Sequence, residues 1–149
     1  MKSAKRAKIV ITSTVEELSD SGLAESSEKT EVKALGLLSV DEGVITLSYK
    51  ESTEGGEVFS EVISGGDTVR VSRKGALTSE FVFTEGAEHA SLYSVGPYSF
   101  DASIKTKRIR GALTEDGGSL SLFYDMSVGG AKKSVKMKIE VAVYDNYRS

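Results

Sequence analysis

The sequence predicts an all-β fold, an antiparallel up-and-down barrel of about eight to ten short strands. Three observations lead to this prediction. Glycine-rich turn signals recur roughly every ten residues, the segments between them alternate apolar and polar side chains, and helical periodicity is nearly absent. Because closure removes the unpaired edges of a sheet, a barrel is the arrangement we expect for a run of hairpins.

The composition is that of one globular domain, which we expect to span residues 1–149. Hydrophobic residues make up 39% and charged residues 28%, a balance that argues against disorder. The chain has no cysteine, so disulfides, thiolate zinc sites and cysteine nucleophiles are excluded. Its net charge of −3 makes nucleic acid an unlikely partner, since dedicated nucleic-acid binders usually carry a basic excess.

The N-terminal segment predicts the first strand, because Ala7, Ile9 and Ile11 occupy alternate positions. The basic residues before it are typical of a signal peptide, but the apolar run at 9–11 is far shorter than the about 7–15 residues that such a signal needs. No stretch reaches the ~20 apolar residues of a membrane span. We therefore expect a cytoplasmic protein without a membrane partner.

Residues 15–31 are interpreted as an acidic, mobile loop with at most one helical turn. Acidic side chains dominate this segment, and Leu18 and Leu23 are too few to form the apolar stripe of an amphipathic helix. Helical periodicity is therefore too weak to predict a helix, and a loop is the prediction here.

The rest of the chain is predicted to form strands separated by turns. The turn signals lie at residues 41–43, 54–56, 65–67, 74–75, 85–86, 96–97, 116–118 and 129–130. Between them, apolar side chains recur at every second position. They are Ile45, Leu47 and Tyr49; Val69 and Val71; Phe81 and Phe83; Phe100, Ala102 and Ile104; Leu120, Leu122, Tyr124, Met126 and Val128; and Val135, Met137, Ile139, Val141 and Val143.

Four of these segments also carry a resemblance to a known family. They read GVITLSYKE at 43–51, VRVSRKG at 69–75, FTEGAEHASLYSVGPY at 83–98 and GGSLSLFY at 117–124. In their order and spacing they resemble the YwiB-like family, a bacterial domain of unknown function. The resemblance implies a calycin-like (lipocalin-like) barrel and carries no established activity. Ser99 departs from the family pattern, which has Thr-Pro-Tyr-Gly where this chain has Gly-Pro-Tyr-Ser.

The candidate ligand site centres on His89, which is the only histidine of the chain. In a strand, His89, Ser91 and Tyr93 share one face. This face would present a polar cluster at the mouth of the barrel, close to Tyr98 and Phe100. The alternative is a structural histidine that is hydrogen-bonded near a turn.

Arg108 and Arg110 form a second candidate, because they fall in phase with the apolar face of Phe100, Ala102 and Ile104. In a regular strand two guanidinium groups would reach the interior or its rim, where a buried arginine needs an anionic partner. The alternative is that the strand passes the rim or that a β-bulge changes the phase.

A basic outer face is predicted for the C-terminal strands, from Lys105, Lys107, Lys132, Lys136 and Lys138. The acidic segment would cover this face, either within the chain or across a homodimer. The simpler interpretation is a solvated lysine row that protects a sheet edge.

Enzyme signatures are absent: the sequence contains no phosphate loop, nucleotide-binding fingerprint, zinc-protease motif or nucleophile elbow. We therefore expect no cofactor, no metal and no catalytic residue, and a module that binds a small apolar or amphipathic ligand. The predicted ligand-binding residues are His89, Tyr93, Tyr98, Phe100 and Arg108. The alternatives are an interaction or self-assembly module with a filled barrel, or an enzyme with a site around His89.

Overall fold

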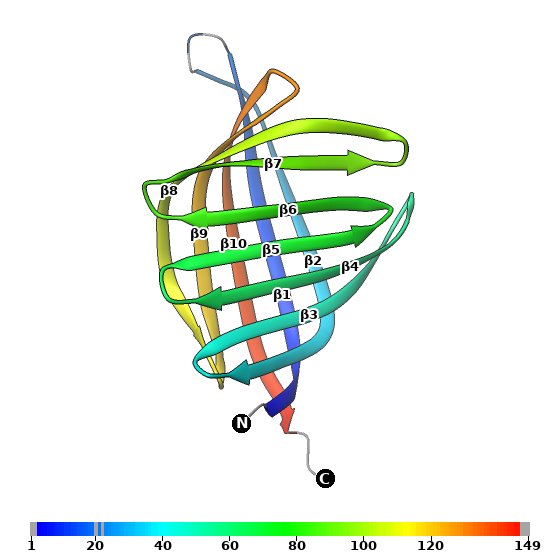
Figure 1. The fold of residues 1–149 in the computed structure, drawn as a ribbon, viewed down its shortest axis with the longest axis vertical. Helices are drawn as coiled ribbons and strands as arrows, with labels where there is room; N and C mark the ends of the chain where they lie inside the picture. Colours follow the sequence, from blue (N-terminus) through cyan, green and yellow to red (C-terminus); the bar gives the residue numbers. More distant parts are fainter. Residues whose placement is uncertain (1–2, 20, 22, 147–149) are drawn as a thin grey trace.

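Ten antiparallel strands close into one barrel in the computed structural model, which describes residues 3–19, 21 and 23–146 (Figure 1). The strands are β1 (Ser3–Leu18), β2 (Ala24–Asp41), β3 (Val44–Thr53), β4 (Gly56–Gly65), β5 (Thr68–Gly75), β6 (Leu77–Thr84), β7 (Glu88–Val95), β8 (Tyr98–Thr114), β9 (Gly117–Val128) and β10 (Ala131–Asn146). Each strand pairs with its neighbours in sequence, and β1 pairs with β10. The predicted up-and-down barrel is confirmed. In the described ranges, no helix is long and apolar enough to span a membrane.

Two sets of strands build the wall. The long strands β1, β2, β9 and β10 run along the length of the molecule, whereas the shorter strands β3–β7 cross them at a steep angle (Figure 1). The β2–β3 and β8–β9 turns lie at the end of the barrel that also carries the termini, which we call the packed end. The β1–β2 and β9–β10 turns lie at the other end, which we call the open end.

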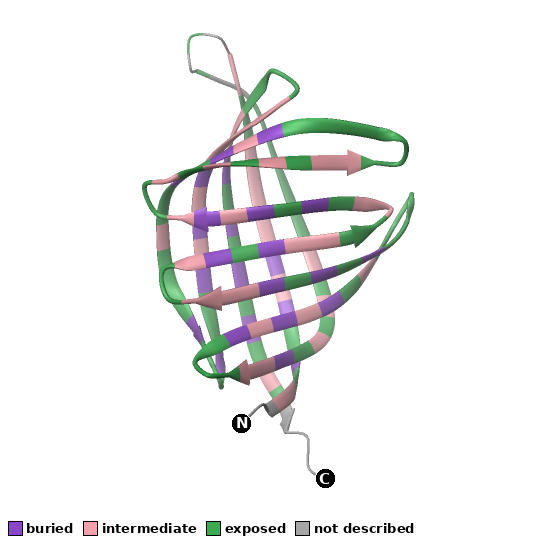
Figure 2. Cartoon of the chain, in the orientation of Figure 1, coloured by how far each residue is buried: buried purple, intermediate pink, exposed green. Residues whose placement is uncertain are grey.

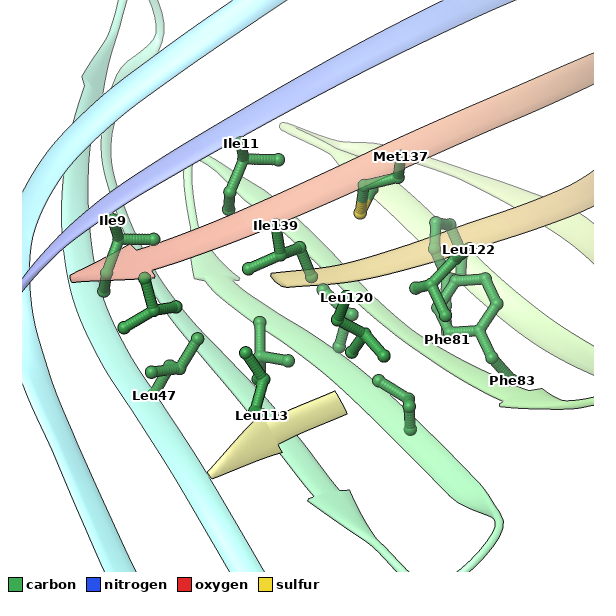
Figure 3. Close-up of a cluster of buried hydrophobic side chains, with 14 of the residues drawn as sticks. Ile9, Ile11, Leu47, Phe81, Phe83, Leu113, Leu120, Leu122, Met137 and Ile139 are labelled. Atoms are coloured by element: carbon green, nitrogen blue, oxygen red, sulfur yellow. The ribbon is translucent and has the colours of Figure 1, made fainter. Parts of the chain in front are cut away.

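The core follows from the period-two alternation predicted for the strands, because buried and exposed residues alternate along the barrel wall (Figure 2). Side chains from several strands meet in the interior of the barrel (Figure 3). Leu47, Leu122 and Ile139 have no exposed surface there, and Ile9 and Leu120 are 1% and 2% exposed. Burial of such side chains is the main stabilising contribution to a fold of this kind.

The acidic segment is a β-hairpin, so the prediction of a loop at residues 15–31 is wrong. Strands β1 and β2 remain paired through this segment, with Val15 opposite Glu28 and Glu17 opposite Ser26. The sequence pattern concealed the strands because β2 pairs with β3 only from Gly36 onward. Much of the earlier part of β2 is solvated, and it therefore lacks a clear apolar alternation.

A β-bulge in β8 reverses the expected orientation of Arg108. Thr106 lies opposite Tyr124 and Arg108 opposite Phe123, which leaves Lys107 as the extra residue. The Glu85 carboxylate accepts a hydrogen bond from the Ile109 amide at 3.0 Å beside this bulge. Beyond it, Ile109 takes the inward position, whereas Arg108 and Arg110 are exposed. These arginines therefore do not follow the apolar face, and the alternative of a β-bulge that changes the phase is the one the structure shows.

Candidate ligand site at the open end of the barrel

A cavity of about 370 Å³ occupies the open end of the barrel. Its lining comes from the inner faces of β1, β2, β3, β5, β6, β7, β9 and β10. Most of the lining is apolar or aromatic: Ile11, Val15, Val32, Tyr49, Val71, Phe81, Tyr93, Tyr124, Met126, Val128, Val135 and Met137. The charged residues of the lining are Glu51, Arg73 and Lys133. The barrel is thus filled with side chains at one end and hollow at the other.

A continuous row of polar side chains crosses the short strands, and three of its five members, Tyr49, Arg73 and Tyr93, line this cavity. Its members lie directly opposite one another on consecutive strands, β3 to β7, and we call them the polar row: Tyr49, Ser60, Arg73, Ser79 and Tyr93. Side chains directly opposite one another on antiparallel strands have Cβ atoms about 5 Å apart. The inward position of each follows from the same alternation that buries the apolar residues of these strands.

Three polar atoms at the centre of the polar row are buried without hydrogen-bond partners in the described chain. Ser60 and Ser79 are 2% and 3% exposed. Within the described chain, the Oγ atoms of both serines and the Nε atom of Arg73 have no hydrogen-bond partner. Arg73 also forms no ion pair with any residue of the described ranges. Buried polar groups in native proteins are nearly always satisfied, so three neighbouring exceptions call for a functional explanation.

Two tyrosines share the environment of Arg73. Burial raises the pKa of Tyr49, and the nearby Arg73 charge opposes this rise to a smaller extent. Burial likewise raises the pKa of Tyr124 to about 12, again opposed by the Arg73 charge. Both phenols are therefore neutral at physiological pH and remain hydrogen-bond donors.

The comparisons with known proteins concern the whole barrel. Residues 14–140 match the family model described as a domain of unknown function, DUF1934. The chain belongs to the DUF1934 family. It is 31% identical over 104 residues to the uncharacterized beta-barrel protein YwiB of Bacillus subtilis (strain 168), a match that covers 70% of this chain and 73% of that protein.

The crystal structure of the ywiB protein from Bacillus subtilis has the same fold as this DUF1934 chain. The TM-score is 0.82 at 26% sequence identity, and the match covers 95% of this chain and 93% of that one. The family expected from the four sequence segments is therefore confirmed, and the family description assigns no function to it.

Of the ligand-binding residues predicted from the DUF1934 sequence, the structure places Tyr93 in the cavity lining, stacked 6.5 Å from Phe81. Tyr98 and Phe100 lie at the β7–β8 hairpin and are 67% and 41% exposed. Arg108 is exposed on the far side of the β8 bulge. The predicted residues are therefore not brought together around one pocket.

His89 lies in a seam where β6 and β7 separate. These strands pair only through residues 77–79 and 93–95. Beyond that point Ser91 Oγ donates a hydrogen bond to the Glu80 carbonyl, and His89 Nε2 lies 3.3 Å from Thr84 Oγ1. These side-chain contacts thus replace part of the backbone pairing that is missing between β6 and β7. His89 has a structural role in this arrangement.

The residues that the sequence prediction missed are Tyr49, Ser60, Arg73, Ser79 and Tyr124. A signal for Arg73 was present, because it continues the alternation of Val69 and Val71 and therefore belongs on the inner face of β5. In the described part of the chain, no group of three or more His, Cys, Asp or Glu side chains is placed to hold a metal ion.

Proposed function

We propose that this DUF1934 protein is a binding module that holds one small apolar or amphipathic ligand in the cavity at the open end. The observation that carries the proposal is the unequal filling of the barrel, packed at one end and hollow at the other. A volume of about 370 Å³ falls within the range of small-molecule pockets. A mostly apolar lining with a few polar groups is also typical of such pockets.

A filled barrel that serves only as an interaction module has less support. Such a barrel would continue its core to both ends, as the side chains around Leu122 do at the packed end. Here the side chains of Val15, Val32 and Met126 border empty volume instead. Exposed apolar surface inside a cavity is costly in water, and an apolar ligand removes that cost.

Titration with the uncharged fluorescent dye Nile red tests the proposal. We expect a saturable increase in fluorescence with one dye bound per chain. Val15→Phe places extra volume in the cavity and should weaken binding roughly tenfold or more, a loss typical of steric exclusion from a pocket.

Val10→Phe is the matched control, because Val10 lies on the same strand and faces outward between Glu140 and Lys33. This variant should bind the dye like the wild type. Absence of saturable binding by the folded wild type, or equal binding by the Val15→Phe variant, would contradict the proposal.

A further inference from the structure

We infer that the polar row recognises an anionic head group, so that the ligand is an amphiphile with an oxyanion at one end and an apolar chain behind it. This inference rests on the proposed function and specifies the class of ligand. It assigns Arg73, which lines the cavity, as the residue that binds the head group; Ser60 and Ser79 lie directly opposite it on the neighbouring strands but are not part of the cavity lining.

The first argument is the missing counter-charge. A guanidinium group that is taken out of water requires a negatively charged or hydrogen-bonding partner, and removal of that partner is strongly unfavourable. The Nε atom of Arg73 is buried and has no hydrogen-bond partner in the described part of the protein, whereas the residue as a whole is half-buried and its guanidinium also interacts with the Tyr49 phenol. Glu51 also lines the cavity, but it forms no ion pair with Arg73. The partner of Arg73 is therefore expected to arrive with the ligand.

The second argument is the arrangement of the donors. Ser60 and Ser79 flank Arg73 on the two neighbouring strands, and each lies directly opposite it. Their hydroxyl groups can donate from both sides while the planar guanidinium donates from the middle. An oxyanion with two or more oxygens can accept all three hydrogen bonds, and arginine forms its strongest hydrogen bonds with such groups.

The third argument is the chemical character of the side chains around the polar row. The neutral phenol of Tyr49 ends the row on β3 and can add another hydrogen bond. The rest of the cavity offers apolar side chains, such as Val32, Val135 and Met137, to a hydrocarbon chain. A charged group on one wall and an apolar lining elsewhere fit an amphiphile better than a wholly apolar ligand.

Competition against bound Nile red tests the inference with ligands that share one tail and differ in the head. Decanoate carries a carboxylate, decyl phosphate a phosphate, decanol a neutral hydroxyl and decylamine a cation. We expect the wild type to bind an anionic member roughly tenfold or more tightly than decanol, as charge-assisted hydrogen bonds predict, and to bind decylamine weakest. Whichever of decanoate and decyl phosphate binds more tightly identifies the source of the oxyanion.

Arg73→Met removes the charge and keeps an unbranched side chain, and it should abolish the preference for the anion while decanol still competes. Lys74→Met is the matched control on the exposed face of the same strand and should keep the preference. The double variant Ser60→Ala/Ser79→Ala retains the charge and should show a smaller loss of preference. It provides an independent readout of the row if the Arg73→Met variant does not fold.

Two results would overturn the inference. One is a wild type that binds decanol as tightly as both anions, and the other is an Arg73→Met variant that keeps the preference. In both cases displacement of the dye by decanol would leave the proposed function standing. If the dye itself did not bind to the folded protein, the proposed function and the inference would fail together.

Discussion

Arg73 lies directly opposite Ser79 across the β5–β6 pair, and within the described chain neither Arg73 Nε nor Ser79 Oγ has a hydrogen-bond partner. On the other side of Arg73, Ser60 lies directly opposite it on β4, and within the described chain the Oγ atom of Ser60 also has no hydrogen-bond partner. Three adjacent unsatisfied donors in one row are unusual for a protein interior. Of these three residues, Arg73 lines the cavity at the hollow end of the barrel, where a ligand can supply the missing acceptor.

The polar row predicts an unusual result for the stability of the Arg73→Met variant without ligand. Because the substitution removes a charge that has no ion-pair partner in the described chain, the free energy of unfolding should stay unchanged or rise by up to about 2 kcal/mol. Urea titration followed by circular dichroism measures the change. A loss of more than about 2 kcal/mol would mean that Arg73 serves the fold rather than a ligand.

Arg70→Met is the matched control for that experiment. Arg70 lies on the same strand but faces outward, where it forms an exposed ion pair with Glu80 at 3.5 Å. Exposed pairs of this kind contribute under about 1 kcal/mol, so only a small loss is expected.

Thr106 is a third buried hydroxyl without a partner in the described chain, and replacing it should be favourable. Its side chain is fully buried next to the β8 bulge, and within the described ranges Oγ1 forms no hydrogen bond. Thr106→Val keeps the shape and removes the unsatisfied group, so we expect stabilisation by about 1 kcal/mol. Chemical denaturation of the wild type and the variant measures the difference in their free energies of unfolding. A Thr106→Val variant less stable than the wild type would indicate that the hydroxyl is satisfied in solution.

Tyr124 predicts an alkaline loss of stability. Its pKa is about 12 in the folded barrel, against 10.0 as the ordinary value, because burial disfavours the phenolate. Between these pH values the unfolded chain releases this proton and the folded chain keeps it, so the free energy of unfolding falls as pH rises. Two pKa units correspond to about 3 kcal/mol.

The Tyr124→Phe variant lacks this ionisable group, and its stability should fall less steeply through the same pH range. Tyr144→Phe changes an exposed position on β10, and the stability of this variant should fall with rising pH as that of the wild type does. Unfolding by urea at a series of alkaline pH values makes the comparison. Equal slopes for wild type and Tyr124→Phe would show that the raised pKa of Tyr124 does not contribute.

The unequal filling of the barrel predicts unequal costs for truncated side chains. Leu122 is fully buried and does not line the cavity, so Leu122→Ala should destabilise the protein by about 2–5 kcal/mol. Met126 is on the same strand but lines the cavity and is only partly buried, so Met126→Ala should cost roughly 1 kcal/mol. Similar losses for the two variants would indicate that the open end is as well packed as the other.

Local patterns predicted the strands correctly where one face is buried, as in Val69 and Val71 or Leu120 and Leu122. They failed in the hairpin around Glu28, because solvent on much of its surface leaves little apolar alternation to detect. They also failed at Arg108, since the bulge before it depends on the distant Glu85 carboxylate and on the amide of Gly86, which donates to the Thr106 carbonyl at 2.8 Å.

The candidate site was harder to predict than the barrel. The inward position of Arg73 follows from the alternation along β5, but its neighbours Ser60 and Ser79 come from two other strands. Their alignment depends on the register of both pairs, which turn spacing alone does not determine. The surroundings of His89 were hard to predict for a related reason, since nothing in the sequence reveals that β6 and β7 separate beside it.

Native mass spectrometry of the full chain with decanoate or decyl phosphate tests the central claim most directly, because it counts ligands on each molecule. The account predicts one amphiphile bound per wild-type chain, little or none on the Val15→Phe variant and one on the Val10→Phe variant. A wild type that carries no amphiphile while circular dichroism shows an intact barrel, or a Val15→Phe variant that binds as the wild type does, would contradict the account.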